Sequence, residues 1–453
     1  MDSSPTFRTY TFGCRVNQAE TIEIERSLQK VGFQPVKDGE SPDIFIINTC
    51  VVTQKAERQV RQLLRKIKRE NVHSFLVLCG CAVNFWQRFA SPKPPQVLFI
   101  KNEDKRKISQ ILKEKFSPQE NFRKPEVVPL DNYQKSGRLI IKIQDGCDQY
   151  CKFCIVPYLR RKLKSKRIAQ IVREVKKAEK EGIKEIILSG INLGLYGKDT
   201  NETLTNLLQN LLKQTSIPRL SFGSIYPEAI DEKFLEIYKK DWQSGPGRLC
   251  HFFHLPLQSG SEKILKLMGR KYNLKKFKLI VEAINKDLPK SFIATDIIVG
   301  FPGEGKKEFE ETITFLESLP IHKYHLFRFS QRPGTPAALM EKKEGVMEKE
   351  KVTRLRLLKL LEEEKWQEFA KRILNHTFST LFLKKENGLW IGLTSNMVKV
   401  RVFDNKVLRK DIKPVRIFKV DGRTLYGKIS KTGPVAPAVE TSSRKAGSSV
   451  LRS

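Results

Sequence analysis

Apolar runs and amphipathic stretches alternate through the first part of the chain. The apolar runs at Thr9–Phe12, Asp43–Ile47 and Ser74–Leu78 predict strands, whereas the polar–apolar repeats at Glu20–Val31 and Gln54–Glu70 predict helices. Strands that alternate with helices indicate a parallel sheet covered by helices. We therefore expect residues 1–125 to form a small α/β domain.

The same alternation starts again after a polar, proline-bearing stretch at residues 101–135, which is predicted to be a connector. Helical patterns separate six further apolar runs, which predict strands at Leu139–Ile143, Glu185–Leu188, Leu220–Ser224, His251–Leu257, Phe292–Val299 and Tyr324–Phe329. Six βα units are fewer than the eight of a complete barrel. Residues 133–372 are therefore expected to form a partial parallel barrel that ends in one long charged helix, Glu341–Leu374.

The pattern changes to short alternating strands in the last part of the chain. The segments TLFLKK, LWIGLT, VKVRVF and VRIFKV are separated by turn signals such as ENG and DNK. This predicts a small β-barrel of OB type over residues 373–431, followed by a disordered tail at 432–453. The barrel either packs as a solvated module or faces a phosphate backbone with its basic residues Lys384, Lys385, Lys399, Arg401, Arg416 and Lys419.

The net charge of the chain indicates what kind of partner it binds. Its 453 residues include 84 Lys and Arg against 50 Asp and Glu, a net charge of +34. Such an excess favours a polyanion, RNA or DNA, although a proteome biased towards lysine gives the same composition. We find no apolar run long enough to span a bilayer and no secretory signal at the N-terminus. We therefore expect a cytoplasmic protein whose cysteines are reduced, which favours metal binding over disulfides.

Three of the eight cysteines have the spacing C-x3-C-x2-C: Cys147, Cys151 and Cys154 in DGCDQYCKFC. Three thiolates can hold three corners of a four-iron cluster and leave the fourth iron open to a small molecule. A structural zinc ion would need four ligands, and the next cysteine is Cys250. The spacing therefore predicts a reactive cluster, with zinc as the alternative, at the catalytic end of the first barrel strand.

A cysteine also stands just past each predicted strand of the first domain. These are Cys14, Cys50, and either Cys79 or Cys81. The carboxyl ends of parallel strands lie at one edge of a sheet, where ligands bind. These cysteines are therefore expected to converge.

Eight motifs together carry a family resemblance over residues 6–430: FGCRVNQAE, NTCVVT, GCAVN, DGCDQYCKFCIVPYLR, LSGINLGLYG, HFFHLPLQSGSEKILKLMGRKY, ATDIIVGFPGE and RPGTPAA. With them the chain resembles the radical S-adenosylmethionine methylthiotransferases, in which a methylthiotransferase domain, a radical enzyme barrel and a TRAM domain follow one another. The opening GCRVNQ resembles the subgroup that acts on threonylcarbamoyladenosine in tRNA. Relatives acting on isopentenyladenosine tend towards GCQMN, and those acting on a ribosomal-protein aspartate towards GCxKN.

The resemblance implies two [4Fe-4S] clusters and S-adenosylmethionine as cofactors. Cys147, Cys151 and Cys154 would hold the radical-generating cluster, and Cys14, Cys50 and Cys81 the second cluster, which leaves Cys79 and Cys250 as buried thiols. The radical would remove the hydrogen from carbon 2 of adenine, which acid–base groups cannot activate, and the second cluster would deliver a methylated sulfur. The residues expected to contact the nucleoside cofactor are Phe153, Gly190, Asn192, Ser224, Gln258 and Gly300, with Gly303 in the same turn as Gly300.

The implied partners are tRNA, through its anticodon stem-loop at position 37, and an electron-donor protein, with no membrane and with the chain itself a monomer. Two alternatives remain: a non-catalytic RNA-binding protein, and the same chemistry on a ribosomal-protein side chain or on isopentenyladenosine.

A basic stretch follows the cysteine loop. Arg160 and Arg161–Arg167 are expected to grip RNA phosphates, or else to form a solvated loop. Relatives usually have Arg-Gly where this chain has Arg160 and Arg161, so the turn there is expected to differ. His251 and His254 flank a predicted strand and are expected to be structural histidines rather than ligands.

Overall fold

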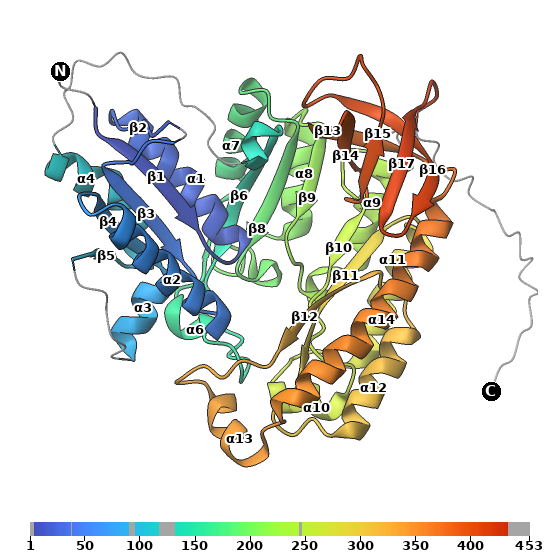
Figure 1. Cartoon of the computed structure of the whole chain (residues 1–453). Coiled ribbons are helices and arrows are strands. Elements are labelled where there is room, and N and C mark those ends of the chain that lie inside the picture. The colour runs from blue at the N-terminus through green and yellow to red at the C-terminus, as the bar shows by residue number, and fades with distance from the viewer. Residues whose placement is uncertain (1–3, 38, 90–95, 117–131, 244–246, 434–453) are drawn as a thin grey trace, which may run out of the picture.

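Three units follow one another along the chain in the computed structural model, which describes residues 4–37, 39–89, 96–116, 132–243 and 247–433 (Figure 1). The domain boundary predicted at residue 125 lies outside these ranges. So does the predicted tail, apart from Thr432 and Gly433.

The first unit is the predicted parallel α/β domain. Its strands run in the order β2-β1-β3-β4-β5, and every pair is parallel. Helices α1 and α4 pack on one face of this sheet and α2 and α3 on the other, each with its own apolar core. The strands are β1 (Thr6–Thr11), β2 (Gln34–Pro35), β3 (Ile44–Thr49), β4 (Phe75–Gly80) and β5 (Leu98–Ile100), and the helices are α1 (Arg15–Lys30), α2 (Gln54–Glu70), α3 (Cys81–Arg88) and α4 (Ile108–Phe116).

The prediction that residues 101–135 form a connector is wrong for the first half of this stretch, which is helical. A 3-10 helix, η1 (Asn102–Lys107), leads there into α4. Ile108 and Leu112 of α4 are completely buried against the sheet. Two apolar residues four positions apart are enough to dock one helical turn, and this signal is hidden among the charged residues of the stretch.

The second unit is the predicted partial barrel. Its six strands are β6 (Arg138–Asp145), β8 (Glu185–Gly190), β9 (Arg219–Phe222), β10 (Phe252–His254), β11 (Phe292–Val299) and β12 (Lys323–Arg328). Neighbours in this order are parallel, with β9 and β10 joined by two isolated bridges, and the short β7 (Lys164–Ser165) pairs antiparallel with β6. The helices of this unit are α5 (Asn132–Lys135), α6 (Val156–Leu159), α7 (Ile168–Lys180), α8 (Leu204–Gln214), α9 (Glu232–Gln243), α10 (Glu262–Met268), α11 (Leu274–Asp287) and α12 (Lys306–Glu317), with 3-10 turns η2 (Leu193–Leu195) and η3 (Pro227–Ala229).

Helix α1 of the first unit lies against the inner face of the barrel strands (Figure 1). Ala19 packs there on Ile140 of β6 and Ile187 of β8. At the start of the same helix, the Arg15 Nη1 donates to the carbonyl oxygen of Phe222, which ends β9, over 3.1 Å. The α/β domain and the barrel therefore share an interior contact, and α1 belongs to both cores.

The long helix predicted at Glu341–Leu374 is two helices, α13 (Pro336–Glu344) and α14 (Glu348–Ile373). The break falls at Gly345, whose backbone is extended. A Cβ at this position would lie 2.5 Å from the carbonyl oxygen of Glu341. The Glu344 carbonyl oxygen, which ends α13, accepts a hydrogen bond from the Gly303 amide over 3.1 Å.

The third unit is a closed five-stranded barrel, as predicted, with the order β13-β14-β15-β17-β16. It docks on the second unit through Arg219, which is 2% exposed and donates to the carbonyl oxygens of Leu393 and Thr394 over 2.6 and 2.8 Å. All six basic residues singled out above are exposed on it. Its strands are β13 (Thr377–Glu386), β14 (Leu389–Thr394), β15 (Lys399–Val402), β16 (Ile412–Asp421) and β17 (Thr424–Ile429).

No helix within the described parts of the chain combines the length and the apolarity needed to cross a bilayer.

Candidate functional site

The ends of three neighbouring strands bring Cys14, Cys50 and Cys81 to one edge of the first sheet. Cys14 follows β1, Cys50 follows β3, and Cys81 opens α3 directly after β4. Burial raises the pKa of Cys50 to about 12, and the nearby sulfurs of Cys81 and Cys14 add to this rise. Gly13 permits the close approach of the first two loops, because its φ is +92° and a Cβ there would lie 2.7 Å from the Cys50 Sγ.

Two polar side chains tie the three loops of this N-terminal triad together. Asn17 of α1 donates from its amide nitrogen to the carbonyl oxygens of Phe12 and Thr49, over 2.8 and 2.9 Å. The Thr49 hydroxyl donates to the Cys79 carbonyl oxygen over 2.6 Å and accepts from the Ala82 amide over 3.1 Å. The carboxyl ends of β1, β3 and β4 are therefore fixed relative to one another.

The second set of cysteines, Cys147, Cys151 and Cys154, occupies the loop between β6 and α6. Burial raises the pKa of Cys154 to about 12, and the neighbouring Cys151 and Cys147 sulfurs contribute. Two N–H donors point at sulfurs of this barrel triad: the Asn192 amide lies 3.8 Å from the Cys147 Sγ, and the Arg270 Nη1 lies 3.5 Å from the Cys151 Sγ. Donors of this kind are what metal-bound sulfurs accept in a second coordination layer.

Each triad offers three thiols as ligands for a metal ion or a cluster. Across the described residues, no three His, Cys, Asp or Glu side chains are arranged to hold one metal ion. A single zinc ion would draw its sulfur ligands to about 2.3 Å from one centre. A four-iron cluster places each thiolate on a separate iron, so its ligands stand further apart. At the barrel triad, three thiols with N–H donors beside two of their sulfurs fit an iron–sulfur cluster. The N-terminal triad offers the same number of thiols.

The loop of the barrel triad packs directly on the first domain. Ile155, which follows Cys154, and Leu159 of α6 are buried in the same apolar core as Cys81. The segment that follows the barrel triad therefore packs in the apolar core beneath the N-terminal triad.

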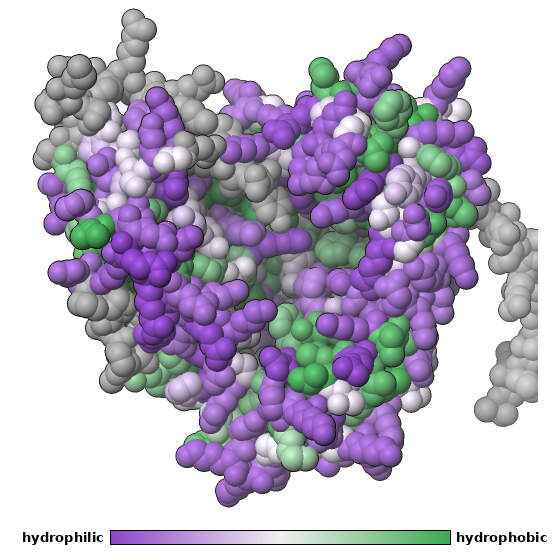
Figure 2. Space-filling view, viewed as in Figure 1, coloured by the Kyte–Doolittle hydropathy of each residue, from purple (hydrophilic) through white to green (hydrophobic). Residues whose placement is uncertain are grey.

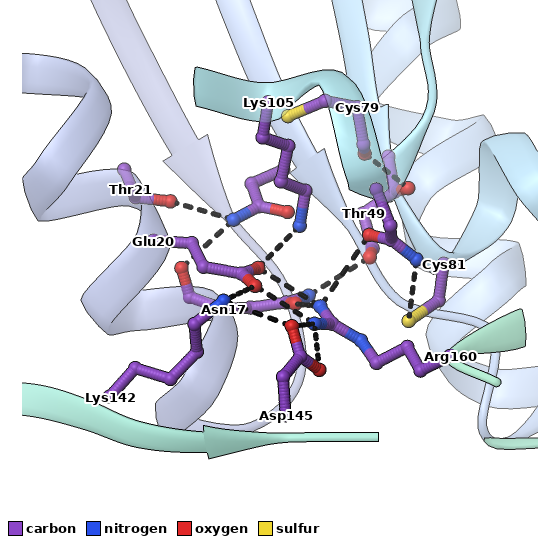
Figure 3. A network of polar contacts seen from close by, with 12 residues as sticks. Asn17, Glu20, Thr21, Thr49, Cys79, Cys81, Lys105, Lys142, Asp145 and Arg160 are labelled. Atoms are coloured by element: carbon purple, nitrogen blue, oxygen red, sulfur yellow. Dashed lines mark hydrogen bonds and ion pairs between the residues drawn. The ribbon is translucent and has the colours of Figure 1, made fainter. Parts of the chain in front are cut away.

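The prediction that Arg160 grips RNA is wrong. Its side chain is 2% exposed, and its Nη1 donates to Glu20 over 2.8 Å and to Asp145 over 2.9 Å (Figure 3). Its Nη2 donates to the Asn17 Oδ1 over 3.0 Å. The next residue, Arg161, is exposed. Arg160 therefore joins α1 of the first domain to β6 of the barrel and faces the interior.

Glu20 is the centre of this buried network. Lys105 and Lys142 also donate to its carboxylate, over 2.5 and 2.7 Å. Burial alone would raise the pKa of Glu20, but Arg160, Lys105 and Lys142 hold it well below its ordinary value. In the same way Arg160 and Lys142 outweigh burial and lower the pKa of Asp145. Both carboxyl groups are therefore ionised at neutral pH.

The residues predicted to contact the cofactor end the barrel strands or lie beside the cysteine loop. Phe153 meets Phe301 edge to face at 6.5 Å between ring centroids. Gly190 ends β8, and a Cβ there would lie 2.8 Å from the Leu193 side chain. The Asn192 side chain donates a hydrogen bond to the Cys147 Sγ.

Three more of these residues follow β9, β10 and β11. Gln258 has a φ of +81°, an unusual and costly conformation for a residue with a side chain. Gly300 has a φ of +72°, and a Cβ there would lie 2.4 Å from the Lys351 Cγ. The Ser224 hydroxyl lies 2.9 Å from the His254 Nδ1, and the His254 Nε2 lies 3.0 Å from an Asp296 carboxylate oxygen.

His251 differs from His254. It is 1% exposed, and its ring stacks on Trp242 at 3.9 Å, but neither ring nitrogen has a hydrogen-bond partner among the described residues. Burial lowers the pKa of His251 to about 3, so its ring is neutral.

A cavity of about 1230 Å³ opens between α1, β6 and α7. Its lining is rich in basic side chains, among them Arg26, Lys142 and Lys166, and includes Glu20 and Arg160. None of the six triad cysteines is among its lining residues, so the cavity lies beside the buried network rather than at either triad.

Two family models match the chain. The model described as "Radical SAM superfamily" matches residues 141–316, and the one described as "Uncharacterized protein family UPF0004" matches residues 6–100. The two matches cover the barrel triad and the N-terminal triad respectively.

Curated relatives match nearly the whole chain. A protein of Aquifex aeolicus named threonylcarbamoyladenosine tRNA methylthiotransferase MtaB is 34% identical, over 86% of this chain and 95% of that protein. The protein of the same name from Thermotoga maritima is also 34% identical, over 89% and 92%. A tRNA-2-methylthio-N(6)-dimethylallyladenosine synthase of Natranaerobius thermophilus is 32% identical, over 93% and 96%.

Among solved structures, the radical S-adenosylmethionine methyltransferase TsrM from Kitasatospora setae superposes with a TM-score of 0.53, over 74% of this chain and 75% of that chain. At 13% sequence identity this likeness shows a shared fold.

Proposed function

Because the chain belongs to the radical S-adenosylmethionine methylthiotransferase family, we propose that it adds a methylthio group to carbon 2 of N6-threonylcarbamoyladenosine at position 37 of tRNA. The observation that carries this proposal is the pair of cysteine triads, one on each domain, joined through the α6 segment and Arg160. The substrate rests on the names of the two 34% identical relatives and on the opening motif GCRVNQ.

Cys147, Cys151 and Cys154 would hold the cluster that binds S-adenosylmethionine. That cluster supplies a one-electron cleavage of S-adenosylmethionine, and so the radical that carbon 2 of adenine requires. Asn192 and Arg270 hold the loop by donating to its sulfurs, and Lys152 anchors it by donating its amide to the Met268 carbonyl oxygen over 2.9 Å. The protein's part here is to fix the geometry of the reagents.

The residues at the strand ends would receive S-adenosylmethionine and the target base. Gly190 ends β8 and Gly300 follows β11, and the carboxyl ends of parallel strands are where ligands collect. The strained Gln258 and the Ser224 hydroxyl offer polar groups at the ends of the intervening strands. Phe153, beside the cysteines, offers an apolar face to an adenine ring.

Cys14, Cys50 and Cys81 would hold the second cluster, whose chemistry is to provide the sulfur that is transferred. These cysteines stand where ligands collect in parallel sheets, at the carboxyl ends of the strands. The exposure of Cys14 leaves that end of the triad accessible to a reagent.

The five-stranded barrel would act as the TRAM domain and bind the tRNA. Lys399 and Arg401 are exposed on β15 and Arg416 on β16, the two strands that flank β17 in the closed barrel. Phe403 and Phe418, two positions after Arg401 and Arg416 in the chain, are also exposed. Cations with interleaved aromatic rings suit phosphates and unstacked bases. Reaction in the cytoplasm, an electron-donor protein and a monomeric enzyme complete the proposal.

Mass spectrometry of tRNA nucleosides from a deletion strain tests the substrate. We expect the 2-methylthio derivative of threonylcarbamoyladenosine to disappear and its precursor to accumulate, and a plasmid copy of the gene to restore it. Persistence of that nucleoside at the wild-type level would refute the assignment. Loss of the 2-methylthio derivative of dimethylallyladenosine instead would favour the activity named for the Natranaerobius relative.

A further inference from the structure

Each cysteine triad is accompanied by the same two kinds of side chain, one asparagine and one arginine. In the barrel these are Asn192 and Arg270, both of which donate to a triad sulfur. At the N-terminal triad, the Asn102 amide lies 3.7 Å from the Cys81 Sγ, and the Arg160 Nη2 lies 3.5 Å from the Asn102 Oδ1. The N-terminal triad therefore also has an arginine nearby, which reaches the Cys81 sulfur through Asn102.

One N–H group of the Arg160 guanidinium donates no hydrogen bond to the described residues. Its two terminal nitrogens are fully engaged by Glu20, Asp145 and Asn17, as described above. Its Nε is buried and has no hydrogen-bond partner within the described residues. Figure 3 shows the Arg160 side chain next to Cys81.

The buried network also carries an excess of positive charge. Within the described residues, the ion pairs centred on Glu20 and Asp145 contain three cations, Lys105, Lys142 and Arg160, but only these two carboxylates. A buried charge without a counter-ion is costly, so an anion is expected beside the network. An oxidised four-iron cluster with three thiolate ligands carries one net negative charge, which matches the excess in sign and size.

We propose that Arg160 is the charge-balancing residue of the second cluster: it supplies the positive charge that this cluster requires, and its free Nε–H donates to a sulfur atom of the cluster. This rests on the proposed function only in so far as Cys14, Cys50 and Cys81 hold a cluster. Reduction adds a further negative charge to the cluster, so a fixed cation beside it favours the reduced state. Arg160 therefore sets the reduction potential of the second cluster as well as joining the two domains.

The test measures the midpoint potential of the second cluster alone. In a background in which Cys147, Cys151 and Cys154 are all replaced by alanine, the reconstituted protein is titrated with reductant and the reduced cluster is followed by electron paramagnetic resonance. Arg160→Gln removes one positive charge, and we expect the midpoint to move to a more negative potential. Arg160→Lys keeps the charge and loses the Nε–H donor, so we expect a smaller shift of the same sign.

Glu20→Gln provides a second variant with the opposite expectation. It removes a carboxylate and raises the excess of positive charge, so the midpoint should move to a more positive potential. The exposed neighbour supplies the matched control, because Arg161→Gln removes the same charge in water and should leave the midpoint unchanged. A purely structural role for the network would lower the unfolding temperature of the Arg160 and Glu20 variants without shifting the midpoint in opposite directions.

Identical midpoints for Arg160→Gln, Glu20→Gln and Arg161→Gln would overturn the inference and leave the proposed function intact. Failure of the background protein to bind iron after reconstitution would instead refute the second cluster, and the role of Arg160 with it. The two failures are thus distinguishable in one series of samples.

Discussion

Single cysteines separate the two halves of the proposed reaction. Cys147→Ala should abolish cleavage of S-adenosylmethionine, because the barrel cluster loses one of its three ligands. Cys50→Ala should leave cleavage at the wild-type rate and stop sulfur transfer, because it affects only the N-terminal triad. The measurements are 5′-deoxyadenosine formed in the presence of a reductant and methylthiolated nucleoside formed in the same reaction.

Cys250→Ala is the matched control for these two variants. Cys250 is as buried as Cys50 but lies outside both triads, so both products should still form. Loss of both products in Cys50→Ala would mean that the N-terminal triad is structural.

Sequence reasoning identified the cysteines but not the residues that support them. The spacing of Cys147, Cys151 and Cys154 is a local signal, and the rule that strand ends share an edge gives Cys14, Cys50 and either Cys79 or Cys81. The family resemblance selects Cys81 over Cys79. Arg160 was assigned to RNA because it opens a run of basic residues. Its burial depends on α1, which comes from another domain and is more than a hundred positions away in the chain. No local pattern distinguishes it from the exposed Arg161.

At the scale of elements, β10 and the helix α9 that packs on it suggest a pH-dependent stability. His251, just before β10, is buried against Trp242 with a pKa lowered to about 3. Between this value and about 6.5, the pKa of an unfolded histidine, the unfolded chain binds a proton that the folded chain does not, so stability rises with pH across the window. On acidification from pH 7 to pH 5, this histidine should cost about 2 kcal/mol of stability.

His251→Phe should remove that cost and keep the stacking on Trp242. Urea unfolding of both proteins at pH 7 and pH 5 measures it: relative to the wild type, the variant should gain about 2 kcal/mol at pH 5. An unchanged difference between the two proteins at the two pH values would show that His251 reaches a proton acceptor or water in the folded state.

Most elements were predictable because their periodicity is local. Strands β1, β3 and β4, the six strands of the partial barrel and β13 to β16 were predicted near their observed positions, and α2 was predicted with its observed bounds. The short edge strands β2 and β5 and the last strand, β17, were not predicted. Other elements differ from the prediction because tertiary contacts set their bounds. The extended Gly345 interrupts a helical pattern that is otherwise continuous, and α4 is stabilised by the sheet beneath it rather than by its own sequence.

At the scale of the whole molecule, three units surround a central hollow. Viewed as in Figure 1, the surface is hollowed between the α/β domain and the small barrel, and hydrophilic side chains surround this hollow (Figure 2). With a net charge of +34, such a surface attracts RNA over long range. The basic residues of the small barrel should contribute measurably to the binding of tRNA.

Replacing Lys399, Arg401 and Arg416 by glutamine should weaken tRNA binding and reduce the slope of log Kd against log salt concentration by about 2. The slope reports how many counterions are released when the tRNA binds, and each phosphate contact that is lost lowers this number. The control removes three charges from the exposed face of α11 and the turn before it, by replacing Lys271, Lys275 and Lys276. Equal slopes for the two triple variants would mean that the barrel is a packing module.

The central claim is that each triad holds its own cluster, and iron content tests it most directly. After anaerobic reconstitution, the wild-type chain should contain about eight irons, and each triad variant, with either Cys14, Cys50 and Cys81 or Cys147, Cys151 and Cys154 replaced by alanine, about four. If the chain without Cys14, Cys50 and Cys81 retained as much iron as the wild type, the N-terminal triad would hold no cluster and the proposed source of sulfur would be lost.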